Sequence, residues 1–123
     1  MKQRLHRIII SLASNEQQER QLEAARILLL QQFPDLHFTQ AHWTEPVNTS
    51  SKRLYLNQLC EGTTSLTPEE ANSVLKAFEQ QLGRTRNEEG IVAIDLDLLL
   101  HGERRFHLRD WERNYIKDLL NEL

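Results

Sequence analysis

Two aspartates, Asp95 and Asp97, stand two residues apart within the apolar segment 94–100. On an extended strand, side chains at i and i+2 point to the same face, so the two carboxylates would stand side by side. Ionised carboxylates this close repel each other unless positive charge lies between them, and a hard divalent cation with oxygen ligands fits that position. The alternative is an amphipathic strand whose polar face meets solvent, because such strands are common. The residues alone leave both interpretations open.

The segments that must position this pair show strand and helix signals in alternation. The run Ile8-Ile9-Ile10 indicates a buried central strand, and Ser14-Asn15 offers a cap for a first helix that Pro34 ends. Thr67 with Pro68 and Glu70 has the pattern of a capping box and marks a second helix start. Strands are predicted at residues 7–13, 36–43, 54–65 and 91–100, and helices at residues 16–32, 68–82 and 110–123.

This order predicts an α+β fold of the ferredoxin-like βαββαβ type, with a C-terminal helix added. The sheet is expected to be mainly antiparallel with the helices packed on one face. No repeat, low-complexity stretch or linker divides the chain, so residues 1–123 are predicted to form a single domain.

The composition bears on which partners the protein could bind and on the compartment in which it works. A net charge of -3 gives no electrostatic footprint for nucleic acid. The apolar segment 7–13 is too short for a membrane span and lacks a secretory cleavage pattern. The single cysteine, Cys60, is expected to be a small packed residue, and together these features favour the cytoplasm. The five histidines show no close pairing, so no structural zinc is predicted and they are expected to be surface or structural residues.

Several motifs, in this order, resemble 6-hydroxymethyl-7,8-dihydropterin pyrophosphokinase, an enzyme family of folate biosynthesis. The strand at 94–100 with its Asp-Leu-Asp motif and the Tyr-Leu-Asn motif at 55–57 are specific together. The other matching pieces are Ser-Leu-Ala-Ser-Asn at 11–15, Thr-Glu-Pro-Val at 44–47, Thr-Ser-Leu-Thr-Pro-Glu-Glu at 64–70 and Glu-Gln-Gln-Leu-Gly-Arg at 79–84.

The resemblance implies transfer of a diphosphate from ATP to the hydroxymethyl group of the pterin, with release of AMP. It implies that Asp95 and Asp97 hold two Mg²⁺ ions against the ATP phosphates. The metal ions and charged side chains would supply most of the catalysis, because phosphoryl-type transfer depends mainly on positioning and charge neutralisation.

Residue by residue, the resemblance also assigns contacts to the two substrates. The pterin site would include Thr44, Val47, Tyr55, Asn57 and, after a gap in the match, Tyr115. The nucleotide site would include Glu79, Arg84 and Arg113, with Arg84 also catalytic. Each has a simpler structural explanation, such as a solvated helix residue for Glu79 or a core-edge packing residue for Tyr55. Asn57 is the exception, because strands disfavour asparagine.

The chain departs from the family pattern where the chemistry is expected. Glu88 and Glu89 lie in the loop before the acidic strand, and Val92 stands where the family has an arginine. Three arginines near in sequence are candidate substitutes for it: Arg86, Arg104 and Arg105. Asp110 lies nearest to the position of a family histidine. An impaired enzyme, a non-catalytic pterin- or nucleotide-binding relative, and a protein-interaction domain with a lapsed site therefore all remain as alternatives. The sequence gives no indication of oligomeric state.

Overall fold

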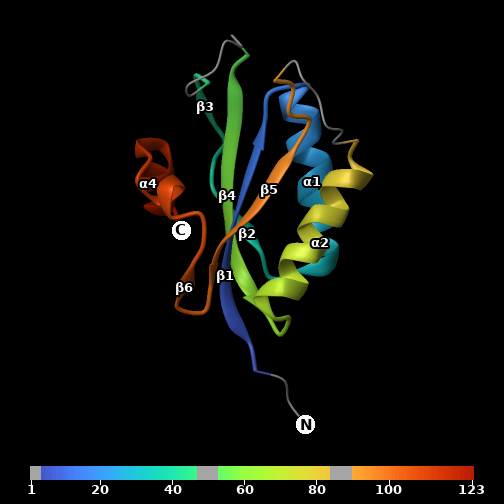
Figure 1. Ribbon diagram of the computed structural model, residues 1–123, viewed down its shortest axis with the longest axis vertical. Coiled ribbons are helices and arrows are strands. Elements are labelled where there is room, and N and C mark those ends of the chain that lie inside the picture. Colours follow the sequence, from blue (N-terminus) through green and yellow to red (C-terminus); the bar gives the residue numbers. More distant parts are fainter. Residues whose placement is uncertain (1–3, 47–52, 84–89) are drawn as a thin grey trace.

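The computed structural model describes residues 4–46, 53–83 and 90–123. In this structure a central sheet has helices on both faces (Figure 1). The strands are β1 (His6–Ser14), β2 (His37–Phe38), β3 (His42–Thr44), β4 (Tyr55–Thr64), β5 (Asp95–His101) and β6 (Arg104–Arg105). The helices are α1 (Gln18–Gln32), α2 (Pro68–Gln81), α3 (Leu108–Trp111) and α4 (Asn114–Leu120).

The sheet has the strand order β2-β4-β1-β5-β6, with β3 also pairing with β4, and the pairs are antiparallel. Helix α1 connects β1 to β2 across β4, and α2 connects β4 to β5 across β1. Each helix therefore joins two strands that are separated by a third, which is the split βαβ arrangement predicted for a ferredoxin-like fold. The short strand β6 was not predicted.

The two faces of the sheet carry separate apolar cores. Alternate residues of β1 point to opposite faces, so Ile8, Ile10 and Leu12 pack under α1 and α2 while Ile9 packs on the other side. On that second side, Ile116 and Leu119 of α4 cover Leu59 and Leu99 of the sheet. The expectation that the helices share one face is therefore wrong for the C-terminal helix, which lies across the sheet from α1 and α2 (Figure 1).

Three predicted elements are shorter or divided. The strand predicted at 36–43 is split into β2 and β3, because the Leu59 N–H donates to the Thr39 side chain (3.0 Å) instead of to a backbone carbonyl. The strand predicted at 91–100 begins at Asp95. The helix predicted at 110–123 is divided into α3 and α4 by Arg113, which has extended backbone angles of φ -75° and ψ 138°.

The start of α2 follows the prediction, whereas the start of α1 does not. Thr67 and Glu70 form both hydrogen bonds of the capping box at the start of α2. At α1, Gln17 is the cap residue, with a φ of 48° and no side-chain capping bond. The Asn15 side chain bonds Gly90 and Val92 instead, which leaves it unable to cap the helix.

Cys60 is fully buried, and burial raises the pKa of its thiol, so it is a packed residue as expected. None of the helices that the structure describes has both the length and the apolar character needed to span a membrane.

Candidate functional site

Asp95 and Asp97 lie on the same face of β5 and line one cavity of about 240 Å³. Leu96 between them points the other way, into the core under α1 and α2. The strand register places Asp95 beside Ala13, and Ala13 beside Asn57 on the next strand; Asp97 lies beside Ser11. The small side chains of β1 therefore form part of the cavity floor between β5 and β4. The predicted geometry of the acidic pair is confirmed.

Five other predicted site residues reach this cavity from three separate parts of the chain. Asn57 and Tyr55 come from β4 and Thr44 from β3, while Arg113 and Tyr115 come from the opposite wall around α4. The convergence of Tyr55, Asn57 and Tyr115 beside the acidic pair is thus confirmed as a placement. Their roles in binding remain predictions. Val47 and Arg84 lie outside the described residues.

Asn57 is held in a fixed orientation by its neighbours. The residue is 4% exposed, and its Nδ2 donates to Thr44 Oγ1 at 2.8 Å and to the His42 carbonyl at 3.1 Å. These bonds fix the plane of the amide and join β4 to β3 at the cavity wall. A buried, oriented amide is suited to recognising a planar ring with donors and acceptors at its edge.

A lysine and a histidine lie close to Asp97. Lys76 Nζ lies 3.4 Å and His107 Nε2 lies 3.6 Å from Asp97 Oδ1. Burial, followed by the charge of Asp95, raises the pKa of Asp97 to about 6. For Lys76, burial lowers the pKa, but the hydrogen bond to Glu79 and the charges of Asp97, Glu79 and Asp95 outweigh it and raise the pKa overall. The acidic pair thus favours a cation, as two adjacent carboxylates should.

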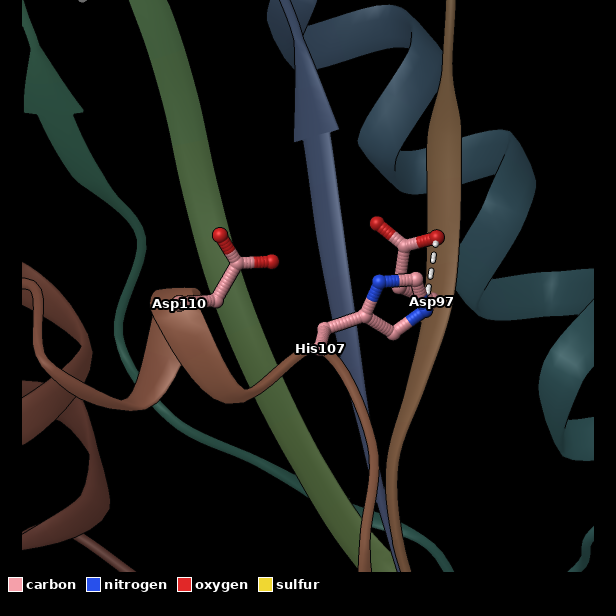
Figure 2. Close-up of side chains that lie close together, drawn as sticks. All are labelled: Asp97, His107 and Asp110. Carbon is pink, nitrogen blue, oxygen red and sulfur yellow. Dashed lines mark ion pairs between the residues drawn. The ribbon is translucent and has the colours of Figure 1, made fainter.

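Lys76, His107 and Asp110 join the site although the sequence predicted no role for them. Ligand atoms of Asp97, His107 and Asp110 all lie within 4.8 Å of one another, and Figure 2 shows His107 pointing toward Asp97. Asp110 lies nearest in sequence to the position of a family histidine that has no clear counterpart in this chain. The histidine at this site is His107, which is expected from the sequence to be a surface or structural residue. The Asp110 carboxylate accepts a hydrogen bond from Arg113 Nε at 3.1 Å.

Glu79 does not line the cavity that contains the acidic pair. Its residue is 4% exposed, and its carboxylate accepts a hydrogen bond from the Leu96 N–H at 2.7 Å and from Lys76 Nζ at 3.0 Å. In this position the Glu79 carboxylate connects α2 to the edge of β5. Its predicted contact with the nucleotide ribose remains a prediction.

The candidate substitutes for the missing arginine lie elsewhere or outside the described residues. Arg104 stacks over the Phe106 ring at 4.8 Å, and Arg105 stacks over the Trp111 ring at 4.3 Å. Arg86, Glu88 and Glu89 are outside the described residues. Val92 is fixed through its backbone, because its N–H donates to Asn15 Oδ1 at 2.6 Å and its carbonyl accepts from the Asn15 N–H at 2.9 Å.

A second cavity, of about 330 Å³, lies between α2 and the segment that follows β6. Its wall includes apolar side chains from Leu98, Phe106 and Pro68. Lys76 and His107, which contact Asp97, line this second cavity as well. The two cavities therefore approach each other at Asp97.

Fold and site together define a ferredoxin-like α+β fold with a pair of aspartates lining a polar cavity. The family model described as 7,8-dihydro-6-hydroxymethylpterin-pyrophosphokinase matches residues 9–123, so the chain belongs to that family.

Relatives named for folate synthesis or for the pyrophosphokinase are similar to this chain at low to moderate identity. A "Folate synthesis bifunctional protein, mitochondrial" of Arabidopsis thaliana is 30% identical over 122 residues, 90% of this chain and 22% of that protein. Another folate synthesis bifunctional protein of the same plant is 35% identical over 83 residues, 59% of this chain and 17% of that protein. A "2-amino-4-hydroxy-6-hydroxymethyldihydropteridine pyrophosphokinase" of Porphyromonas gingivalis is 28% identical over 131 residues, 94% of this chain and 89% of that protein. The chain thus spans about a fifth of the length of these plant relatives.

Proposed function

We propose that this chain is a diphosphotransferase that moves a diphosphate from ATP to 6-hydroxymethyl-7,8-dihydropterin and releases AMP. The observation that carries the proposal is the position of Asp97, between a polar cavity and a partly apolar one. Transfer between two substrates needs two adjacent binding sites, with groups between them that stabilise the charge of the transferring phosphoryl group.

The proposed pterin place is the cavity that contains Asn57, because its oriented amide and the neighbouring Tyr55 and Tyr115 suit a planar heterocycle. The proposed nucleotide place is the second cavity, where apolar walls fit a base and Lys76 with His107 fits phosphate. In this arrangement, the pterin hydroxyl oxygen gives up its proton to solvent and bonds to the β-phosphorus. The bond from that phosphorus to the α–β bridging oxygen breaks, and AMP leaves with the bridging oxygen.

Asp95 and Asp97 are the proposed ligands of Mg²⁺, and the donor set fits that ion because carboxylate oxygens are its preferred protein ligands. Bound magnesium would neutralise phosphate charge and hold the transferring group in line. The family resemblance implies two ions here. The number depends on how much positive charge the protein itself supplies at Asp97.

The second candidate function is binding of a pterin or nucleotide without turnover. Val92 favours it, because an apolar side chain in place of the family arginine cannot donate hydrogen bonds to a phosphate. For the compartment we propose the cytoplasm, on the single buried cysteine and the absence of a disulfide framework in the sequence.

The test is AMP formation by the purified chain with ATP, Mg²⁺ and the dihydropterin, together with calorimetry using a non-hydrolysable ATP analogue. The double variant Asp95→Asn/Asp97→Asn should lose both AMP formation and magnesium-dependent nucleotide binding. Asp118→Asn, a change at an exposed aspartate of α4, is the matched control and should behave as wild type. Binding without AMP would favour the second function, and no binding of either substrate would contradict both.

A further inference from the structure

The ammonium group of Lys76 is fixed at the acidic pair by three acceptors. Its Nζ lies 3.0 Å from Glu79 Oε2, 3.0 Å from the Leu96 carbonyl oxygen and 3.4 Å from Asp97 Oδ1. An ammonium has three N–H donors, so these contacts match its full capacity. Although the side chain is 41% exposed, its head is therefore oriented by the protein.

The outer edge of β5 explains why Lys76 stays in this position. Among the described residues, β6 pairs with Leu100 and His101, and the edge at Leu96 faces α2. The Leu96 N–H donates to Glu79 and the Leu96 carbonyl accepts from Lys76, which satisfies both backbone groups. Moving Lys76 away would leave that carbonyl without its side-chain donor and would break an ion pair.

Building on the proposed function, we propose that this site binds one divalent cation, between Asp95 and Asp97. The Lys76 ammonium takes the place of the second divalent cation that the family resemblance implies. Lys76 is thus a binding residue for the nucleotide phosphates in its own right. The family resemblance implies two ions at the aspartate pair, so this chain would be a one-ion variant of the site.

The distribution of groups around Asp97 supports a single ion. Mg²⁺ needs oxygen ligands at about 2.0–2.1 Å in nearly octahedral geometry. On the side of Asp97 Oδ1, however, stand the Lys76 ammonium and the imidazole of His107, both within 4 Å. A second dication there would be repelled by the fixed ammonium. On the other side, Asp95 and Asp97 both face the polar cavity, where one ion can be held.

Lys76 also lines the second cavity, so the same ammonium can face a phosphate placed there. Because its three N–H donors already contact protein acceptors, Lys76 would act on such a phosphate through its charge, as a compact ammonium does at many phosphate sites. A nucleotide bound in the second cavity would therefore meet one dication and one ammonium.

The experiment counts bound Mn²⁺ ions by electron paramagnetic resonance, with the full chain and the non-hydrolysable analogue α,β-methylene ATP. We expect wild type to bind one Mn²⁺ per chain. Lys76→Gln keeps a donor for the Leu96 carbonyl but removes the charge, and it should bind two, with spectral broadening from the neighbouring spins. Lys76→Arg keeps the charge and should bind one.

Lys117→Gln makes the same change at an exposed lysine of α4 and should leave the count at one. Thermal unfolding of each variant shows whether it is folded. Two ions in wild type would overturn the proposal, and so would a count of one in folded Lys76→Gln. If Lys76→Gln fails to fold, the number of bound Mn²⁺ ions in wild type and in Lys76→Arg decides: one in each supports the proposal, and two in either contradicts it. Absence of nucleotide-dependent Mn²⁺ binding in wild type would instead contradict the proposed function, together with the one-ion site that rests on it.

Discussion

Asp97 is the residue where the charges of this site meet. Its carboxylate faces Asp95 on the same strand and has Lys76 and His107 within 4 Å. Burial and the neighbouring aspartate nevertheless raise its pKa to about 6 from 3.8, so the folded protein without metal disfavours the charged form. The side chain that best suits a cation therefore costs stability when no cation is present.

This cost predicts that Asp97→Asn stabilises the metal-free protein at neutral pH. Between about pH 4 and pH 6 the folded state binds more protons than the unfolded state, so wild-type stability falls as pH rises through that window. At pH 7.5 the variant should be more stable by about 1–3 kcal/mol, at roughly 1.4 kcal/mol per pKa unit. Urea unfolding at pH 7.5 and pH 5 measures this, and the difference should shrink at pH 5.

Magnesium with nucleotide should reverse the order of stability of wild type and Asp97→Asn. A ligand that binds only the folded state stabilises it, so Mg²⁺ with nucleotide should raise the unfolding midpoint of wild type and not that of Asp97→Asn. The predicted cost of the charged Asp97 is contradicted if Asp97→Asn is less stable than wild type at pH 7.5 without metal. It is also contradicted if the gain in stability of the variant does not depend on pH.

Val92 is the second residue on which activity should depend. A well-placed arginine at a transferring phosphoryl group is worth about 10³–10⁵ in rate, so Val92→Arg should raise AMP formation, by about 10-fold or more even with imperfect placement. Val92→Met, of similar length but uncharged, is the control. Adding Glu89→Trp, which introduces the tryptophan that the resembled family carries at this position, should raise the rate further. Measurable binding of ATP and pterin with no gain in rate would mean that another step limits the reaction.

At the scale of elements, the site depends on how the acidic segment of β5 and the loop before it are held in place. Strand β1 and α2 flank its acidic segment, while Asn15 holds the segment that leads into it. The Asn15 side chain donates to the Gly90 carbonyl at 2.8 Å and accepts from the Val92 N–H at 2.6 Å, and the residue is 1% exposed. One amide thus connects the end of β1 to the loop that precedes the aspartates.

Asn15→Ala should therefore destabilise the protein and reduce AMP formation together. Loss of the amide removes a hydrogen-bond partner from the carbonyl of the exposed Gly90 and from the N–H of the half-buried Val92, at a cost of about 0.5–1.5 kcal/mol each. Asn15→Asp keeps the acceptor for Val92 but not the donor for Gly90, and should fall between wild type and alanine. Urea unfolding and initial rates measure the two effects. Wild-type stability in Asn15→Ala would show that the connection is unimportant.

At the scale of the whole molecule, the sheet separates the cavity that contains Asn57 from the apolar core under α1 and α2. Helices α1 and α2 cover one face, while α3 and α4 lie over the other and form a wall of the cavity that contains Asn57 (Figure 1). Leu29 of α1 and Leu119 of α4 are both fully buried, but only Leu119 lines that cavity.

These two leucines provide a matched comparison. Leu29→Ala and Leu119→Ala should each cost about 2–5 kcal/mol in the free energy of unfolding, as buried leucines usually do. Pterin affinity, measured by calorimetry below the unfolding transition, should fall in Leu119→Ala and stay unchanged in Leu29→Ala. Equal loss of affinity in both variants would contradict the separation of this cavity from the core under α1.

The sequence by itself determined the features that depend on short-range geometry. The two-residue period places Asp95 and Asp97 on one face, and the capping box at Thr67 sets the start of α2. The order of strand and helix signals indicated the fold type, and motifs shared with the family placed Asn57 and Tyr115 at one cavity. These features follow from local backbone periodicity or from residue patterns that can be compared directly.

Only the tertiary structure decided which side chains from distant segments meet. Lys76 and His107 reach Asp97 from α2 and from the segment after β6, and Asn15 binds Val92 across 77 positions in place of capping α1. The placement of α4 on the face opposite to α1 and α2 is a further example. Such contacts depend on strand order, edge exposure and packing between layers, and a charged or polar residue carries no local signal of the partner that it will find.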